Sequence, residues 1–315
     1  IESDGVKPSL RNSGLRGFKS RLASKSAIKI IADASKSDAP DLFVDWRLVP
    51  WMGAELCNYP ANWFIIDRGP PADDGILGRL QWRYWMKSWR MAGDSASGGM
   101  VVSDEHEKIV RPYSGQKIPI CSLSGGVKKS KISSQRRIKP DEILNLVYIG
   151  RIDKNRGVKD LISILDWAEK RDMVLNMHIA GEGDESEFLR SDSRIIHHGF
   201  LGSEDVHLLL SECDIGLLPM PPGPVWSTSS PLKLAEYAAA GLAVVGVNHP
   251  GHLLPESREW MDLGPVHDWW SKGISRFSEL SPEEWNSVHN SATSAAKELT
   301  FERLAERLEE FMGSV

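Results

Sequence analysis

The chain has 315 residues, of which 41% are hydrophobic and 26% charged, and its formal net charge is −5. A chain of this length is expected to form two domains with substantial cores, and it contains no apolar run long enough to span a bilayer. Its three cysteines are far apart and form no CxxC pair. This spacing favours a reducing compartment over a disulfide framework or a structural zinc site.

The charge is divided unevenly along the chain. Residues 1–140 carry 23 Lys and Arg against 14 Asp and Glu, a net charge of +9, whereas residues 141–315 have a net charge of −14. We therefore expect two modules with different electrostatic tasks. The basic module suits contact with anionic lipid, nucleic acid or an acidic substrate.

The first half shows short apolar runs separated by helical patterns. DLFVDW and ANWFII are typical of strands that end in turns. His106 lies in a charged helical run and is expected to be solvated. Residues 111–140 contain eight basic and no acidic residues, which indicates an interdomain linker. We predict an irregular segment at 1–17, helices at 18–34, 79–91 and 104–110, and strands at 41–46, 61–66, 98–102 and 118–123.

The predicted helix from Arg79 to Met91 has a basic face and a tryptophan-bearing face. Each set of residues recurs at spacings of three or four, so each lies on one side of the helix. Such a helix suits contact with a membrane surface. It also suits a helix that packs its tryptophans into the core, and no nucleic-acid-binding module accompanies it. The basic set is Arg79, Arg83, Lys87 and Arg90, and the aromatic set is Trp82, Trp85 and Trp89.

The second half alternates strand-like and helical runs, a pattern that predicts βαβ units and a parallel sheet with helices on both faces. No strand separates its last two helices. The expected strands are 143–149, 174–180, 194–197, 215–218 and 242–247, and the expected helices are 158–170, 203–211, 231–240, 282–299 and 301–312.

Ligands bind beyond the carboxyl ends of the strands in such a sheet. Arg151 and Arg156 flank a strand-to-helix turn, and two guanidinium groups near a helix start suit a diphosphate. The segment Ser229–Pro231 predicts a helix start with a hydroxyl cap and a proline at the first helical position, which also suits a phosphate. Two polar residues interrupt the apolar run of that helix, Lys233 and Glu236.

Five segments in this order resemble the nucleotide-sugar domain of glycosyltransferase family 4, a retaining group within glycosyl transferases group 1 that has the GT-B fold. The resemblance implies an α/β protein with two Rossmann-like doubly wound domains, the N-terminal one incomplete and without its first strands. It divides the chain into an acceptor-side domain with its basic linker (1–138), a nucleotide-sugar-binding domain (139–285) and helices that pack back toward the first domain (286–315). The segments are GRIDKNRG (150–157), HIAGEGDE (178–185), IIHHGFLGSEDVHLLLSECDIGLLP (195–219), SPLKLAEYAAAGLAVV (230–245) and LTFERLAERL (299–308).

The resemblance also implies roles for individual residues. Arg151 corresponds to the arginine on the donor diphosphate, and Arg156 stands where the family usually has lysine. Glu236 corresponds to the glutamate that binds the ribose, whereas Thr228 replaces the first glutamate of the E-x7-E pattern. Asp67 lies near the position of a polar residue beside the transferred sugar, although a turn residue before Gly69 is an equal interpretation. The other implied donor contacts are Gly181, the backbone of Phe200 and Leu201, the amides of Ser229 and Ser230, and Lys233.

The function implied is retaining transfer of a sugar from a UDP- or GDP-sugar to a glycan or lipid-linked acceptor. No D-x-D triplet occurs, and no metal or other cofactor is expected, because two arginines and a helix N-terminus can stabilise the departing diphosphate. The expected location is cytoplasmic, at the inner face of the membrane, with contact through residues 79–91 and no nucleic-acid partner. Two alternatives stay open, a sugar-nucleotide epimerase on the same scaffold and a non-catalytic nucleotide-sugar-binding protein.

Overall fold

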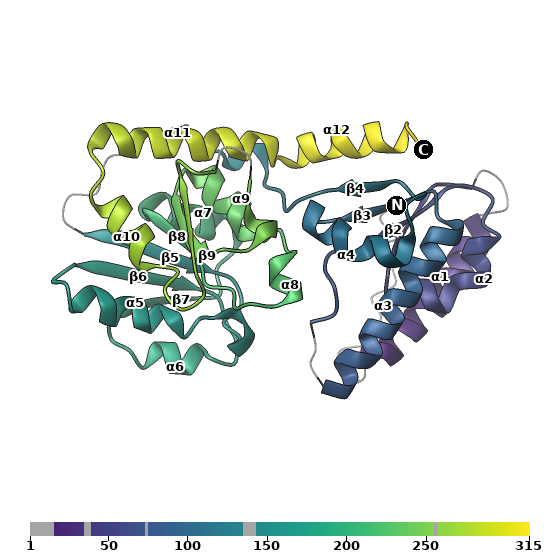
Figure 1. The fold of residues 1–315 in the computed structure, drawn as a ribbon, viewed down its shortest axis with the longest axis horizontal. Coiled ribbons are helices and arrows are strands. Elements are labelled where there is room, and N and C mark those ends of the chain that lie inside the picture. The colour runs from purple at the N-terminus through teal and green to yellow at the C-terminus, as the bar shows by residue number, and fades with distance from the viewer. Residues whose placement is uncertain (1–15, 35–38, 73–74, 135–142, 255–256) are drawn as a thin grey trace. The chain divides into compact units, whose positions relative to one another are not determined.

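The computed structural model describes residues 16–34, 39–72, 75–134, 143–254 and 257–315 (Figure 1). The chain forms two compact units. Unit 1 comprises Ile1–Val101, Glu107–Ser122 and Val315, and unit 2 comprises Val102–His106 and Leu123–Ser314. The division near residue 122 precedes the expected domain boundary near residue 138. Most of the segment predicted to be irregular, 1–17, lies outside the described residues.

Unit 1 contains a parallel sheet whose strand order follows the chain, β1-β2-β3-β4. All four predicted strands are present, and the helix predicted at 18–34 is confirmed. The short helix α2 was not predicted, because its nine residues are apolar on most sides and lack a helical period. The strands are β1 (Leu42–Asp45), β2 (Trp63–Ile66), β3 (Gly98–Val101) and β4 (Ile120–Ser122), and the helices are α1 (Arg16–Ala34), α2 (Val49–Cys57), α3 (Gly75–Ser95) and α4 (Asp104–Ser114).

The linker prediction for residues 111–140 is wrong over its first part. The last turn of α4 continues through Arg111, whose guanidinium pairs with the carboxylate of Glu107 one turn earlier. Strand β4 then pairs in parallel with β3. His106 is fully buried, as is Val110 one turn later on α4. The expectation that His106 is solvated is therefore wrong.

Helix α3 packs its tryptophans inward. Trp85 and Trp89 have no exposed surface, and Trp82 is half-buried. Of the two interpretations of this helix, the core-packing one holds for Trp85 and Trp89. These two side chains are therefore not available to a membrane.

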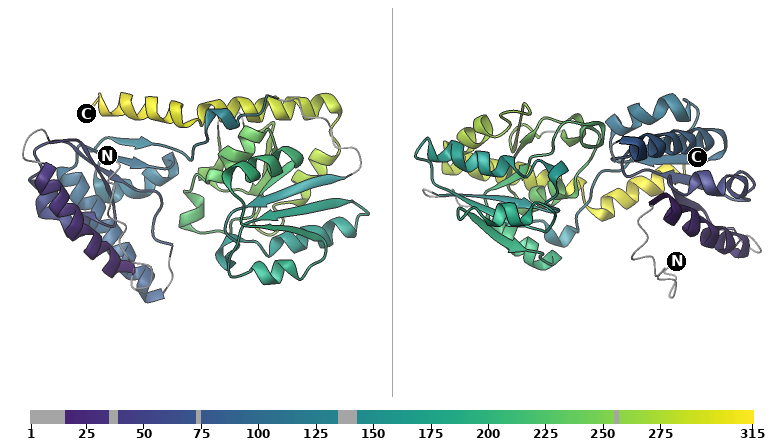
Figure 2. Two further views of the ribbon diagram at one scale, coloured as in Figure 1. Left: turned by 180° about the vertical axis from the view of Figure 1, so that it is seen from behind. Right: turned by 90° about the horizontal axis from the view of Figure 1, so that it is seen from below.

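Unit 2 contains a six-stranded parallel sheet with helices on both faces (Figures 1 and 2). Helices α7, α9 and α11 pack together, while α5 and α6 cover the other face. The strands are β5 (Leu144–Ile149), β6 (Leu175–Ala180), β7 (Ile195–Gly199), β8 (Ile215–Leu218), β9 (Ala243–Val247) and β10 (Met261–Gly264), and the α-helices are α5 (Asp160–Glu169), α6 (Ser186–Arg190), α7 (Ser203–Glu212), α8 (Pro224–Ser227), α9 (Leu232–Ala240), α10 (Ser271–Ser278), α11 (Pro282–Glu298) and α12 (Phe301–Met312). The described part of the unit also contains the 3-10 turns η1 (Lys129–Lys131), η2 (Lys154–Arg156) and η3 (Pro250–His252).

The strand order of unit 2 reverses beside β5. The order is β10-β9-β8-β5-β6-β7, so the chain proceeds in one direction from β5 to β7 and in the other from β8 to β10. This is the doubly wound arrangement that the alternating pattern predicts. A crevice outside the carboxyl ends of β5 and β8 is where such a sheet binds ligands.

Two glycines allow the strand ends at this crevice to approach one another. A Cβ on Gly157 would lie 1.7 Å from the carbonyl oxygen of Pro219, and a Cβ on Gly181 would lie 1.9 Å from that of Gly150. Both glycines also have positive φ angles, 70° and 145°. Any side chain at either position would force the ends of β5, β6 and β8 apart.

The C-terminal helices have well-formed starts. Ser281 and Glu284 form a capping box at α11, and the hydroxyl of Thr300 accepts a hydrogen bond from the amide of Arg303 at α12. Their packing toward the first domain stays a prediction. Within the described part of the chain, no helix is long and apolar enough to cross a bilayer.

Candidate functional site

The crevice at the strand-order reversal collects most of the predicted donor residues of unit 2. The loop after β5 carries Arg151 and Arg156, and the loop after β8 leads through α8 into the start of α9. Lys233 and Glu236 lie in the first two turns of α9, three residues apart and therefore on one side of that helix.

Lys233 is a buried lysine whose Nζ has no hydrogen-bond partner among the described residues. Its side chain is 8% exposed, and its Nζ lies 3.8 Å from the centre of the Tyr148 ring. No hydrogen bond to Nζ is present within the described residues. Burial and the charge of Arg156 hold the pKa of Lys233 well below its usual range, against a smaller raising effect of Glu236. A bound anion would satisfy this ammonium group and restore its charge.

Arg156 is the second cation at this place. Its guanidinium carbon lies 4.6 Å from the centre of the Trp226 ring, and its Nε is buried without a hydrogen-bond partner among the described residues. Two neighbouring cations with unsatisfied donors form a site suited to a multiply charged anion.

The start of α9 differs from the prediction. The helix begins at Leu232, its N-cap residue is Pro231, and no side chain caps it. The predicted hydroxyl cap is wrong, because both serine hydroxyls are used elsewhere. Ser229 donates from both its Oγ and its amide to the carbonyl of Trp226, and the Oγ of Ser230 accepts from the amide of Gly125. Within the described structure, the positive end of the α9 dipole has no side-chain cap.

Arg151 lies at the rim of the site. Its side chain is 70% exposed, and it forms two hydrogen bonds to the carboxylate of Asp153, of 2.6 and 3.0 Å. The hydrogen bonds from Arg151 lower the pKa of Asp153 and raise that of Arg151. Because an exposed ion pair contributes little stability, the guanidinium can exchange this partner for a phosphate at low cost.

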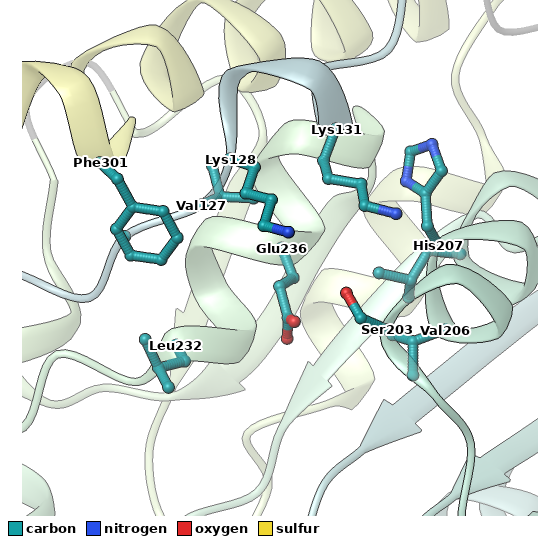
Figure 3. A pocket seen from close by; sticks show the side chains of 11 residues that line it. Val127, Lys128, Lys131, Ser203, Val206, His207, Leu232, Glu236 and Phe301 are labelled. Carbon is teal, nitrogen blue, oxygen red and sulfur yellow. The ribbon is translucent and has the colours of Figure 1, made fainter. Parts of the chain in front are cut away.

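Glu236 lines a cavity of about 190 Å³ between α7, α9 and the segment around η1 (Figure 3). Its carboxylate points into the cavity, and Lys128 lines the same cavity. Burial raises the pKa of Glu236, and the charge of Lys233 opposes this effect. The apolar part of the wall is formed by Val127, Val206, Leu210, Leu232 and Phe301.

The expected base contacts, Phe200 and Leu201, are absent from the wall of this cavity. Phe200 is 84% exposed and Leu201 is half-buried, and neither lines the cavity. The cavity wall is formed instead by Ser203 and Val206, in the first turn of the helix that follows. Thr228, at the position of the first family glutamate, is buried and donates its hydroxyl hydrogen to the carbonyl of Pro224 at 2.8 Å.

Asp67 belongs to unit 1 and lies in its core. It is 1% exposed, and one carboxylate oxygen accepts hydrogen bonds from the indole nitrogens of Trp85 (2.5 Å) and Trp89 (2.8 Å). Its other oxygen accepts from the amide of Gly69. This geometry fits the turn interpretation, with an added role in anchoring α3, better than the catalytic one.

Three residues at the site were not identified from the sequence. Tyr148 provides the ring beneath Lys233, Trp226 the ring against Arg156, and His252 a hydrogen bond to Ser229 at 3.2 Å. The position of Tyr148 two residues before Gly150 was a usable signal, because it belongs to the strand that ends at the crevice. Neither Trp226 nor His252 recurs with any period, so the sequence gives no comparable signal for them.

Residues 144–260 match the family model described as glycosyl transferases group 1. The resemblance to that group is therefore confirmed over these residues, which extend from β5 to the segment before β10 and include Arg151, Arg156, Lys233 and Glu236. No protein with a curated description matches the sequence significantly.

Solved structures share the fold at low sequence identity. The sucrose-phosphate synthase of Thermosynechococcus elongatus is 16% identical, with a TM-score of 0.74, over 94% of this chain and 79% of that one. The pneumococcal O-GlcNAc transferase GtfA, solved with UDP and GlcNAc, is 18% identical, with a TM-score of 0.67, over 93% of this chain. Anabaena HepE, solved with UDP, is 13% identical, with a TM-score of 0.67, over 91% of this chain and 81% of that one.

These similarities establish the fold alone. They confirm the predicted class, an α/β protein of GT-B type with parallel sheets. The chain spans 59% of the length of the pneumococcal transferase.

Proposed function

We propose that unit 2 binds the diphosphate of a nucleotide sugar between the loop after β5 and the start of α9. The observation that carries the proposal is the Lys233 ammonium group, which is buried and has no hydrogen-bond partner in the described structure. A buried ammonium group that lacks a hydrogen-bond partner is expensive, and a site that binds a phosphate when in use explains its presence. Arg156 and the uncapped end of α9 add positive charge at the same place.

The nucleoside is proposed to lie toward Glu236. The ribose hydroxyls would donate to the Glu236 carboxylate, and the cavity beside it offers apolar wall for the base. Lys233 and Glu236 are three residues apart on one helix, which suits the short distance between a diphosphate and its ribose. The UDP bound in the structures of pneumococcal GtfA and of HepE supports this assignment by analogy.

The proposed reaction is transfer of the sugar to a glycan or lipid-linked acceptor with retention of its anomeric configuration. Breaking the sugar–phosphate bond leaves a nucleoside diphosphate whose added negative charge must be stabilised. Lys233, Arg156 and Arg151 provide three cations for that task. We propose that they perform it without a metal ion.

A transfer assay tests this proposal. The protein is incubated with UDP- and GDP-sugars and extracts of glycan or lipid acceptors, with and without a chelator, and the anomeric configuration of the product is read by NMR. We expect donor-dependent, chelator-insensitive, retaining transfer that Arg151→Ala reduces tenfold or more, because a hydrogen bond to a charged group contributes about 1.5–3 kcal/mol. The exposed Arg171→Ala is the matched control. An Arg151→Ala variant with full rate contradicts the assignment, and interconversion of the donor without acceptor indicates an epimerase.

A lipid-linked acceptor would require contact with a membrane surface, which we propose is made by the first turns of α3. Ile76, Leu77, Leu80 and Tyr84 are between 42% and 79% exposed there. Arg79, Arg83 and Lys87 are exposed on the same segment, and no acidic residue occurs in its first turn. Exposed apolar and basic side chains on one helix are complementary to an anionic lipid surface.

A further inference from the structure

Trp226 provides the aromatic ring that Arg156 contacts in the proposed diphosphate site. It belongs to α8, a helix of four residues in the loop between β8 and α9, and its ring lies 4.6 Å from the guanidinium carbon of Arg156. The ring is half-buried and packs against the core of unit 2. Because the ring is held by this packing, it offers the Arg156 guanidinium a fixed surface.

Hydroxyl groups hold α8 in place. The hydroxyl of Thr228 donates to the carbonyl of Pro224 at 2.8 Å, and that of Ser229 donates to the carbonyl of Trp226 at 3.0 Å. Gly223 begins the turn with a φ of 156°, and Pro224 occupies the first helical turn. Thr228 therefore helps to build the element that carries Trp226.

The turn η3 packs against the loop that contains α8. A Cβ on Gly251 would lie between 2.7 and 3.0 Å from backbone atoms of residues 227–229, so the two backbones are in close contact. His252 is fully buried, and its Nε2 lies 3.2 Å from the Oγ of Ser229.

We propose that Trp226 is a positioning residue that orients Arg156 toward the donor diphosphate; this inference rests on the proposed function. A guanidinium group whose face lies on an indole keeps its N–H groups available, because they point outward in the plane of the guanidinium. The ring also replaces part of the hydration that Arg156 loses on partial burial. A long, flexible side chain thus meets its ligand already ordered, which lowers the entropic cost of binding.

The test is a set of binding titrations of the full chain with UDP, GDP, uridine and guanosine. Trp226→Leu keeps apolar packing and removes the aromatic face, Trp226→Phe retains a face, and Arg156→Met removes the cation. We expect Trp226→Leu to weaken diphosphate binding about three- to thirtyfold and nucleoside binding less than twofold. Trp226→Phe should retain most of the wild-type affinity for the diphosphate. In the Arg156→Met background, Trp226→Leu should weaken diphosphate binding less than twofold.

A second cation–π pair provides the matched control. Arg171 lies 4.8 Å from the ring of Trp167 at the end of α5, and Trp167→Leu should change no binding constant. Equal diphosphate binding by Trp226→Leu and wild type overturns the inference and leaves the proposed function intact. The inference is also overturned if Trp226→Leu weakens diphosphate binding equally in the wild-type and Arg156→Met backgrounds, or if it weakens uridine and UDP binding equally. Either result indicates general damage to the site. Absence of diphosphate binding by the wild type instead rejects the proposed function.

Discussion

Lys233 connects the stability of the protein with its proposed ligand. In the folded state its pKa is depressed, chiefly by burial, whereas the unfolded chain restores the ordinary value. Between the two values the unfolded state binds more protons, so Lys233 lowers stability as the pH falls through that window. The site is therefore destabilising until an anion fills it.

Replacing Lys233 with methionine should separate these two effects. We expect Lys233→Met to raise the unfolding free energy of the ligand-free protein by about 1–3 kcal/mol, because a buried unsatisfied donor is removed. Chemical denaturation at neutral pH measures the change. The exposed Lys170→Met is the control and should leave stability within about 0.5 kcal/mol. A destabilised Lys233→Met protein would mean that the ammonium group has partners in the folded state.

Glu236 should distinguish ribose from deoxyribose. If its carboxylate accepts hydrogen bonds from ribose hydroxyls, Glu236→Ala should weaken UDP binding about tenfold and 2′-deoxy-UDP binding less. Titration calorimetry with the two nucleotides gives the ratio directly. The exposed Glu212→Ala on α7 should preserve the wild-type ratio. An unchanged ratio in Glu236→Ala would remove this residue from the proposed ribose site.

The sequence predicted residue types at the site better than it predicted their partners. Arg156, Lys233 and Glu236 lie where strand ends and a helix start were expected to bring them together. The hydroxyls of Ser229 and Ser230 were predicted to face the ligand, yet they bind the backbone of neighbouring turns. A serine in a loop has many nearby backbone acceptors, and the sequence does not show which one it uses.

At the scale of elements, the turn η3 packs against the loop between β8 and α9, and its His252 makes the stability of the protein depend on pH. Burial, followed by the charges of His249 and Lys233, lowers the pKa of His252 to about 3. The unfolded chain takes up a proton near pH 6.5 and folded His252 does not. The stability that depends on neutral His252 is thus present above pH 6.5 and is lost as the pH falls toward 3.

We therefore expect the wild type to lose stability with acidification at up to about 1.4 kcal/mol per pH unit from this group. His252→Gln should show a shallower dependence of Tm on pH between 7 and 4.5. His267 is exposed, and His267→Gln should retain the wild-type slope. Equal slopes of Tm against pH for wild type and His252→Gln would show that folding does not lower the pKa of His252.

Helix α3 should bind anionic vesicles through its first turns. Ile76→Ser combined with Leu80→Ser removes exposed apolar surface and should weaken co-sedimentation with phosphatidylserine vesicles tenfold or more. Wild-type binding should also fall as salt screens Arg79 and Arg83. The matched control is Val174→Ser, which removes a comparably exposed side chain from unit 2. Binding that survives the double variant would place any lipid contact elsewhere.

Elements with a strong pattern were predicted well, and short ones were not. Strand β8 and helix α12 have the predicted bounds, because an uninterrupted apolar run and a regular helical period leave little choice. Helices α2, α6, α8 and α10 and strand β10 were missed. Helix α8 has four residues in a proline-rich loop, and β10 is a short edge strand of alternating character. Tertiary contacts rather than local pattern determine such elements.

For the whole molecule, the alternation of strands and helices was enough to predict a doubly wound sheet. It was not enough to place β8 beside β5, and this pairing creates the crevice. The tryptophans of α3 show the same limit. Their spacing predicted a shared face, but only the fold shows that Trp85 and Trp89 bury Asp67.

The most direct test of the central claim is calorimetric titration of the protein with UDP and GDP. We predict that at least one of them binds. We further predict that Lys233→Met and Arg156→Met each weaken that binding tenfold or more, whereas Arg171→Met, at an exposed arginine that also lies over a tryptophan ring, leaves it unchanged. Binding of neither nucleotide, or wild-type affinity in Lys233→Met, would contradict a donor diphosphate site at the start of α9.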